Sequence, residues 1–180
     1  MAVINANCIA IYFFDHDSTT QPETVEATEL PSADTTGGNK LYHTSAKAFL
    51  GFGEYSSGAW NEVTYTLAGA ATSSSIDLTN TVEDVARNGT GGTIQESNQE
   101  WTVTCDGLIQ DSNDAGETLM DIARDANYVI VKFQTDKDGT DVEYIGIALL
   151  DNVSLSGGVD EIATYTVSMT GVNDLYKYSA

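Results

Sequence analysis

Apolar and polar side chains alternate in two stretches near the C-terminal end of the sequence, which is the pattern of strands that bury one face. The second stretch, residues 162–170, sets Thr164, Thr166, Ser168 and Thr170 opposite Ala163, Tyr165, Val167 and Met169. The first stretch spans residues 142–155, and the glycine-containing residues 156–160 between them suit a tight reversal. We therefore expect an antiparallel hairpin. A lone hairpin is only marginally stable, so further strands and a covering layer must accompany it.

The same alternation predicts strands elsewhere. Residues 60–67 set Val63, Tyr65 and Leu67 opposite Glu62, Thr64 and Thr66, and residues 99–109 set Trp101, Val103 and Cys105 opposite Thr102, Thr104 and Asp106. The apolar stretches 3–14 and 128–134 predict two more strands, and 76–78 and 82–86 predict short ones. Small residues at 68–75 and glycines at 89–92 indicate connectors, the latter mobile, while 41–55 gives no clear prediction.

One amphipathic helix is predicted over residues 114–126. Asp114 suits the N-cap, and Glu117 three positions later completes a capping box. The apolar residues that follow recur at helical spacing, namely Leu119, Ile122, Ala123 and Ala126. The predicted fold class is therefore mainly β, a sandwich or barrel-like sheet with one flanking helix.

Residues 15–40 differ from their surroundings, because they contain both prolines and few large apolar side chains. Such a segment buries too little surface to fold by itself, so we predict a long loop or arm that orders against a neighbouring subunit. The C-terminal residues 172–180 are expected to do the same. The candidate residues for this contact are Asp15, Glu23, Glu26, Glu29, Leu30, Tyr176 and Tyr178.

Composition limits the possible partners. The 180 residues fit a single domain, and 27 acidic against 7 basic side chains give a net charge of −20 with 41% apolar residues. This predicts a folded protein whose surface repels nucleic-acid phosphates rather than binding them. No run of about 18 apolar residues and no signal-peptide pattern is present, so we expect no membrane insertion. Cys8 and Cys105 are interpreted as small buried side chains.

The sequence offers little chemistry. His16 lies between two aspartates, but no second imidazole or thiol is spaced to complete a metal site, so a solvated loop is favoured. Residues 136–143 resemble a calcium loop only loosely and lack the sixth-position glycine and twelfth-position glutamate of an EF-hand. No nucleophile elbow, P-loop or dinucleotide-binding glycine motif occurs. The prediction is a protein that is not an enzyme and has no cofactor or metal.

Several segments, taken in order, resemble the major tail tube proteins of long-tailed bacteriophages. These are residues 94–108, which end in Asp106-Gly107-Leu108, then the helix, then 128–133 with Val131-Lys132-Phe133, and finally 153–171 with its Ser-Gly-Gly-Val-Asp turn. The upstream residues 76–80 and 82–87 resemble the short strands that precede this signature in the family. The resemblance covers roughly residues 60–171, and no motif accounts for residues 15–40.

The resemblance implies a structural virion protein that forms hexameric rings, stacked into a tube through which genomic DNA leaves the capsid. It implies a place in the virion tail, assembly in the host cytoplasm, and contacts with tape measure, tail terminator and distal tail proteins. It favours a non-contractile tail. Polar strand faces would line an acidic lumen that repels DNA, and the candidates for this face are Glu62, Thr64, Thr66, Glu100, Thr102 and Thr104.

A second class of function fits the same strands. A virion decoration protein or a receptor-binding β-sandwich would share the alternation, the loops and the acidic surface. Such a protein would be monomeric or trimeric and would expose an aromatic-rich binding patch. The assembly state of the purified protein discriminates between the two hypotheses.

Overall fold

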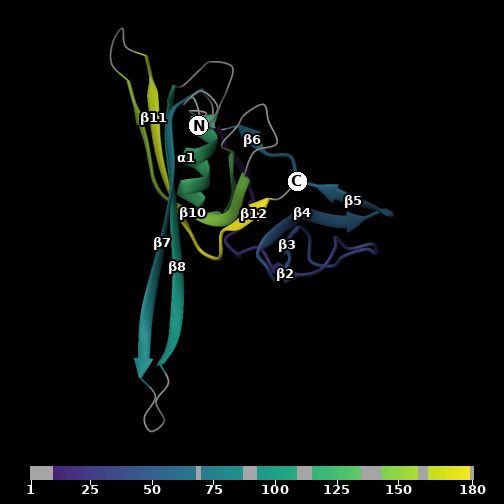
Figure 1. The fold of residues 1–180 in the computed structure, drawn as a ribbon. Coiled ribbons are helices and arrows are strands. Elements are labelled where there is room, and N and C mark those ends of the chain that lie inside the picture. The colour runs from purple at the N-terminus through teal and green to yellow at the C-terminus, as the bar shows by residue number, and fades with distance from the viewer. Residues whose placement is uncertain are drawn as a thin grey trace, which may run out of the picture.

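The computed structural model of the chain describes residues 10–67, 70–86, 93–108, 115–134, 143–157 and 162–178. Within these ranges strands dominate, accompanied by the single helix α1 (Ala115–Asp125), as Figure 1 shows. The strands are β1 (Ala10–Asp15), β2 (Thr24–Glu26), β3 (Lys40–His43), β4 (Ala48–Ser56), β5 (Ala59–Glu62), β6 (Thr66–Leu67), β7 (Ala70–Ala86), β8 (Thr93–Leu108), β9 (Val129–Gln134), β10 (Glu143–Ser156), β11 (Thr164–Gly171) and β12 (Tyr176–Tyr178). The predicted fold class, mainly β with one flanking helix, is confirmed.

All of these strands belong to one open sheet. Its main path runs β2-β3-β4-β12-β10-β11-β8-β7, with β1, β5, β6 and β9 branching from it. Pairing is antiparallel except where β2 meets β3 and β12 meets β4. The first half of β10 pairs with β9 and β12, and the second half pairs with β11, so β10 carries the sheet from one layer into the next.

Strands β9 and β10 form a central wall with a hydrophobic core on each face. Alternate residues of β9 point to opposite sides, so Val129, Val131 and Phe133 enter the first core while Ile130 enters the second. The first core also contains Ile11, Phe13, Leu119, Ile122 and the apolar side chains of β8 and β11, and the second contains Leu41, Phe49, Phe52, Ile145, Ile147 and Tyr176. Burial of both faces explains why residues 128–134 form an almost continuous apolar run.

The helix covers the first core. Leu119 and Ile122 are fully buried, as the apolar stripe predicts. The helix ends where Ala126 adopts a positive φ of 54° and the N–H of Asn127 donates to the carbonyl of Ile122 at 3.2 Å, a Schellman-type C-cap. The predicted helix is confirmed, although its proposed N-cap, Asp114, lies outside the described residues.

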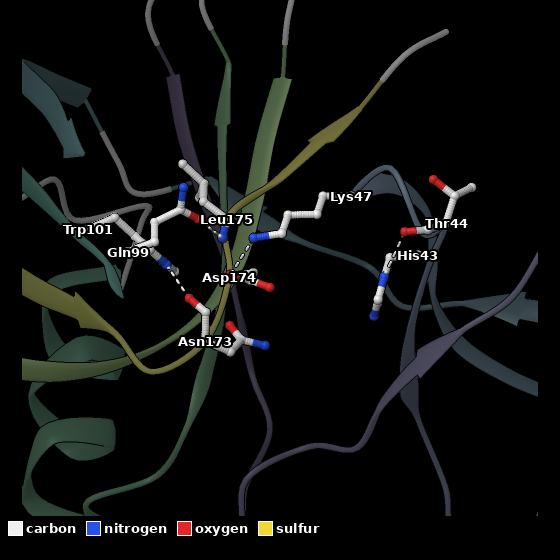
Figure 2. A network of polar contacts seen from close by, with 8 residues as sticks. All are labelled: His43, Thr44, Lys47, Gln99, Trp101, Asn173, Asp174 and Leu175. Atoms are coloured by element: carbon white, nitrogen blue, oxygen red, sulfur yellow. Dashed lines mark hydrogen bonds and ion pairs between the residues drawn. The ribbon is translucent and has the colours of Figure 1, made fainter. Parts of the chain in front are cut away.

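Trp101 is the largest fully buried side chain among the described residues, and it is next to Thr102, the last residue of β8 in the ladder with β11. Its indole covers the backbone at Gly146 and Gly171, where an added Cβ would approach the ring closer than 3.0 Å. The indole N–H donates to the carbonyl of Asn173 at 2.6 Å, as Figure 2 shows. The Asn173 Oδ1 accepts the N–H of Ile147 at 3.2 Å. The short segment after β11 therefore ties β8 to β10.

Two hairpins project from the body in opposite directions. The β7–β8 hairpin is the longest element and extends far below the helix in Figure 1, with a ladder that runs from Ala70↔Leu108 to Ala86↔Thr93. The β10–β11 hairpin extends upward, and β2 to β5 form a lobe at the side. The strong antiparallel hairpin predicted for residues 142–170 is confirmed in its strands, while residues 158–161 of its turn lie outside the described residues.

Several sequence predictions for residues 41–86 are wrong. Residues 60–67 do not form one strand but divide between β5 and β6, and residues 68–75 are not a connector, because β7 begins at residue 70. The two short strands expected at 76–78 and 82–86 are parts of this single 17-residue strand. Residues 41–55, which gave no prediction, contribute to β3 and β4. Residues 3–9 and the glycines at 89–92 lie outside the described residues.

The segment 15–40 is also more structured than expected. It contains β2, its Pro22 is buried, and Glu23 forms an ion pair of 2.7 Å with Lys40. The backbone N–H of Leu41 donates to the carbonyl of Glu23 at 2.9 Å. Hydrogen bonds to β3 therefore hold part of the segment on its own subunit, while most of residues 16–39 lie in a long loop, as predicted. Its contact with a neighbouring subunit stays a prediction.

Candidate functional site

Four strands form a continuous antiparallel sheet in the order β10-β11-β8-β7 that extends beyond the central wall. The register joins the strands row by row, so that Asn152, Ser168, Thr104 and Ser75 lie side by side across the sheet. Because side chains alternate between the faces of a sheet, each row of this kind belongs to one face. We use the name four-stranded sheet for β7, β8, β11 and residues 149–156 of β10.

One face of the four-stranded sheet is polar. It carries hydroxyl, amide and carboxylate side chains on every strand: Asn152, Ser154 and Ser156 on β10; Thr164, Thr166, Ser168 and Thr170 on β11; Thr102, Thr104 and Asp106 on β8; and Ser73, Ser75, Asp77 and Thr79 on β7. Neighbouring strands exchange side-chain hydrogen bonds across this face. The Ser73 hydroxyl donates to Asp106 Oδ2 at 2.7 Å, and the hydroxyls of Ser75 and Thr104 lie 2.8 Å apart. These contacts order the polar face.

The four-stranded sheet carries acidic but no basic residues. The segments of β7, β8, β10 and β11 contain no lysine or arginine, whereas the polar face includes Asp77, Asp106 and, at the bulge of β10, Asp151. The pKa of Asp106 is lowered by hydrogen bonds from the hydroxyls of Thr166 and Ser73, so its carboxylate stays charged. The Asp151 carboxylate accepts a hydrogen bond from Thr170. The face is therefore negative and offers phosphate groups no cationic partner.

The opposite face is apolar and belongs to the first core. Trp101, Val103 and Cys105 of β8 and Tyr165, Val167 and Met169 of β11 are all buried there. Burial raises the pKa of the Cys105 thiol, whose Sγ lies 3.7 Å from the Tyr165 hydroxyl, so this cysteine is a packing residue rather than a reactive one. The contrast between the two faces fixes which side of the sheet meets water.

Neither outer edge of the four-stranded sheet has a partner strand in the part of the chain that the structure describes. Over the residues described, β7 pairs with β8 alone, and residues 149–156 of β10 pair with β11 alone, since the β9 ladder stops at Ala148. Long unpaired edges leave backbone N–H and C=O groups free to pair with another chain. Each edge strand also carries a β-bulge, between Ala71 and Ser73 and between Leu150 and Asn152. The sheet thus has the features of an assembly surface.

The predicted lumen-facing residues divide between two places. Glu100, Thr102 and Thr104 lie on β8, and Thr102 and Thr104 are part of the polar face. Glu62 lies on β5, Thr66 on β6 beside β1, and Thr64 between these strands, so this group is not part of the four-stranded sheet. The serines of β7 were not predicted to be part of this face, because a run of small polar residues shows no alternation of apolar and polar side chains. The threonines of β11 were visible in the alternation of residues 162–170.

The predicted arm residues lie mostly on the surface of the chain's own side lobe. Glu26 and Glu29 are exposed, Leu30 packs near Gly51, and Asp15 ends β1. Tyr176 differs from the others, because it is buried in the second core and stacks on His43 at 4.5 Å between ring centroids. Its assignment as an inter-subunit residue is therefore corrected: Tyr176 anchors the C-terminal segment to its own subunit. The side chain of Tyr178 is outside the described part of the chain.

Potential metal ligands do not cluster among the described residues. No group of three or more histidine, cysteine, aspartate or glutamate side chains among them is arranged to hold a metal ion. His16 has a lowered pKa because burial outweighs the charges of Asp15 and Asp17, and its ring packs edge-on to Phe52. No described helix has the length and apolar character to cross a bilayer.

A β sheet with one polar face, one core face and outer edges unpaired among the described residues is suited to assembly. Comparisons with known proteins give the family. The model of the phage tail tube protein family matches residues 54–175, which is more than half of the sequence. The chain belongs to the phage tail tube protein family. It is a structural protein of the virion tail and not an enzyme.

Solved structures with the same fold come from viral tails and related particles. The tail of an empty gene transfer agent particle, refined with C6 symmetry, matches with a TM-score of 0.50 and 16% identity over 64% of this chain and 87% of that chain. The SPP1 tail tube matches with a TM-score of 0.52 and 11% identity over 99% of this chain and 80% of that chain. No curated protein matches the sequence. At these identities the structural matches establish the fold.

Proposed function

We propose that the protein polymerises into hexameric rings that stack to form a tail tube, with the polar face of the four-stranded sheet lining the lumen. The observation that carries this proposal is the two-faced sheet with two unpaired edges, β7 and residues 149–156 of β10. The first and fourth strands of an antiparallel sheet run in opposite directions. The β7 of one copy can therefore pair antiparallel with the β10 of the next, and repetition of this contact closes a barrel without a free edge.

The width of the lumen depends on the number of strands in the ring. Six copies supply 24 strands, four from each copy. With strands about 4.8 Å apart and tilted by about 40°, a 24-stranded barrel has a backbone diameter of roughly 48 Å, and a trimer with half as many strands only about 24 Å. Inward side chains reduce each diameter by roughly 10 Å, and only the larger lumen then admits duplex DNA. The C6 symmetry of the gene transfer agent tail agrees with six copies.

The charge of the lumen suits the passage of DNA. Asp77, Asp106 and Asp151 lie on or beside the polar face, which has no basic side chain to hold a phosphate. Binding to DNA depends on neutralising phosphates with lysine and arginine, so a negative wall lets the duplex slide during ejection. We propose that Thr102, Thr104 and Glu100 lie in the lumen with the threonines of β11. Glu62, Thr64 and Thr66 belong to a different part of the surface.

Other contacts would complete the tail. We propose that the rings meet tape measure, tail terminator and distal tail proteins, and that assembly takes place in the host cytoplasm. The exposed side of residues 15–40, with Glu23, Glu26 and Glu29, is our candidate for contact with an adjacent subunit, now as a folded segment rather than a free arm. The side lobe from β2 to β5 in Figure 1 is where this contact would occur.

Negative-stain microscopy of the purified protein at rising concentration tests the proposal. We expect rings or tubes with sixfold symmetry and a central channel. A monodisperse monomer at every concentration would contradict polymerisation, and a trimer would favour a decoration or receptor-binding protein.

A further inference from the structure

Three large hydrophobic side chains are exposed among the residues that the structure describes: Leu78 at 47%, Leu155 at 43% and Ile162 at 71%. Two of them share a setting. Leu78 lies on β7 opposite Trp101, and Leu155 lies on β10 opposite Tyr165, so both are on the apolar face of the four-stranded sheet and on its two unpaired edges. The third, Ile162, precedes β11, an inner strand of that sheet.

Burial on the apolar face falls from the middle of the sheet to its edges. On the inner strands Trp101 and Tyr165 are each only 1% exposed. On the outer strands Ile76 and Val153 are half-buried, and Leu78 and Leu155 are exposed. The helix and β9 cover the centre of this face but not the two edges. Each edge therefore ends in a leucine whose outer side lacks a cover within the described chain.

We propose that Leu78 of one copy and Leu155 of the next form an apolar seam that seals the ring on the side facing away from the lumen. This inference rests on the proposed function, because it assumes that β7 and β10 of neighbouring copies come together. Paired strands keep equivalent faces on the same side, so joining the two edges brings both leucines, with Ile76 and Val153, to the apolar side of the junction. Within one copy Leu78 is level with Trp101 of β8 and Leu155 is level with Gly107, six residues apart along that strand. The two leucines of neighbouring copies therefore meet when each copy is staggered along the strands relative to the one before it, as closing a barrel of tilted strands requires.

A second copy of this chain is the occupant that fits. Each copy carries a net charge of −20, so association must overcome repulsion between like charges. The two edge strands contain no lysine or arginine to form ion pairs across the junction. Burial of apolar side chains can still stabilise the junction between two copies. Each copy contributes Leu78 to the junction with one neighbour and Leu155 to the junction with the other. A closed ring is built from a heterologous contact of this kind, in which two different patches of neighbouring copies meet.

Serine substitutions test the seam. We expect Leu78→Ser and Leu155→Ser each to raise the concentration needed for ring formation about tenfold, since each removes the burial of about half a leucine side chain at every junction. Ile162→Ser is the matched control: it removes a more exposed side chain that lies just before β11 and not on an edge strand, and ring formation should stay at the wild-type concentration. Circular dichroism checks that all three variants fold. Equal effects from all three, or no effect from the two leucine variants, would overturn the seam.

Crosslinking provides a second measurement. The double variant Leu78→Cys, Leu155→Cys, assembled and treated with a short bismaleimide, should give a ladder of covalent species that stops at six copies. Each single variant should give no covalent species larger than one chain, and the wild-type protein measures the background crosslinking of its native cysteines. An assembled double variant without a ladder would refute the seam while leaving ring formation intact. Absence of rings and tubes in the wild-type protein would instead refute the proposed function.

Discussion

Alanine at Gly171 should destabilise the protein through Trp101. The indole lies against the backbone of Gly171, and a Cβ built there would approach Cε2 and Nε1 of the ring closer than 3.0 Å, a separation that folded proteins do not tolerate. The ring has little room to move, because it is 1% exposed and also covers Gly146. Its displacement would also stretch the hydrogen bond to the carbonyl of Asn173.

The expected cost combines two effects. Overpacking a rigid core site costs about 1–3 kcal/mol, and weakening one hydrogen bond adds about 1 kcal/mol. A loss of about 3 kcal/mol is a large part of the usual free energy of unfolding, and it lowers the melting temperature by roughly 6–12 °C in a chain of this size. Urea denaturation followed by circular dichroism measures the difference, provided that the unfolding stays two-state.

Two variants make this test specific. Gly157→Ala is the control, because its Cβ would lie at an ordinary 3.4 Å from that of Ala163, and stability should change by less than about 0.5 kcal/mol. Trp101→Phe combined with Gly171→Ala should cost less than the sum of the two single changes, because the smaller ring relieves the overlap. Wild-type stability in Gly171→Ala, or simple additivity in the double variant, would show that the ring does not require glycine there.

Four further predictions concern other parts of the structure and its assembly. Asn173→Ala should cost about 1–2 kcal/mol in urea denaturation, because the N–H of Ile147 loses its acceptor, and an unchanged midpoint would contradict that role. The pKa of Asp106 in the folded protein is held below its ordinary value of 3.8. The contribution of this carboxylate to the free energy of unfolding is therefore complete above pH 3.8 and is lost as the pH falls through the lower pKa of the folded state. Asp106→Asn should reduce this loss of stability at acidic pH. If the polar face lines the lumen, Thr104→Lys with Thr166→Lys should still permit tube formation but give salt-sensitive retention of DNA during ejection, and unchanged ejection would count against the lumen assignment. Added salt should lower the concentration needed for ring formation, because it screens the repulsion between copies, and a salt-independent threshold would contradict this.

The sequence predicted the elements whose faces differ strongly in polarity. The strands around Trp101 and Tyr165 and the helix at Leu119 each have one buried and one solvated side, and the structure confirms them. The β7 strand was missed over residues 70–75, because alanine, threonine and serine give no contrast between faces. Its partner β8 holds this weak pattern in place through the hairpin ladder, an interaction that local patterns do not reveal.

The segment from residue 15 to residue 40 shows a different limit. Its composition correctly indicated that it has little core of its own, but it is ordered by backbone hydrogen bonds to β3 and by the Glu23–Lys40 ion pair, partners that lie next to it only in the folded chain. The same limit applies to the prediction of the candidate site. The polar residues of β8 were identified, whereas Glu62 was grouped with them because alternation identifies a polar face but not the sheet to which it belongs.

An electron cryomicroscopy map of the assembled polymer tests the central claim most directly. We predict sixfold rings in which β7 of each subunit pairs antiparallel with residues 149–156 of the next subunit's β10, with Thr104, Thr166 and Asp106 facing the channel. A map in which these edges stay apart, or in which the polar face of the four-stranded sheet points away from the channel, would contradict the account.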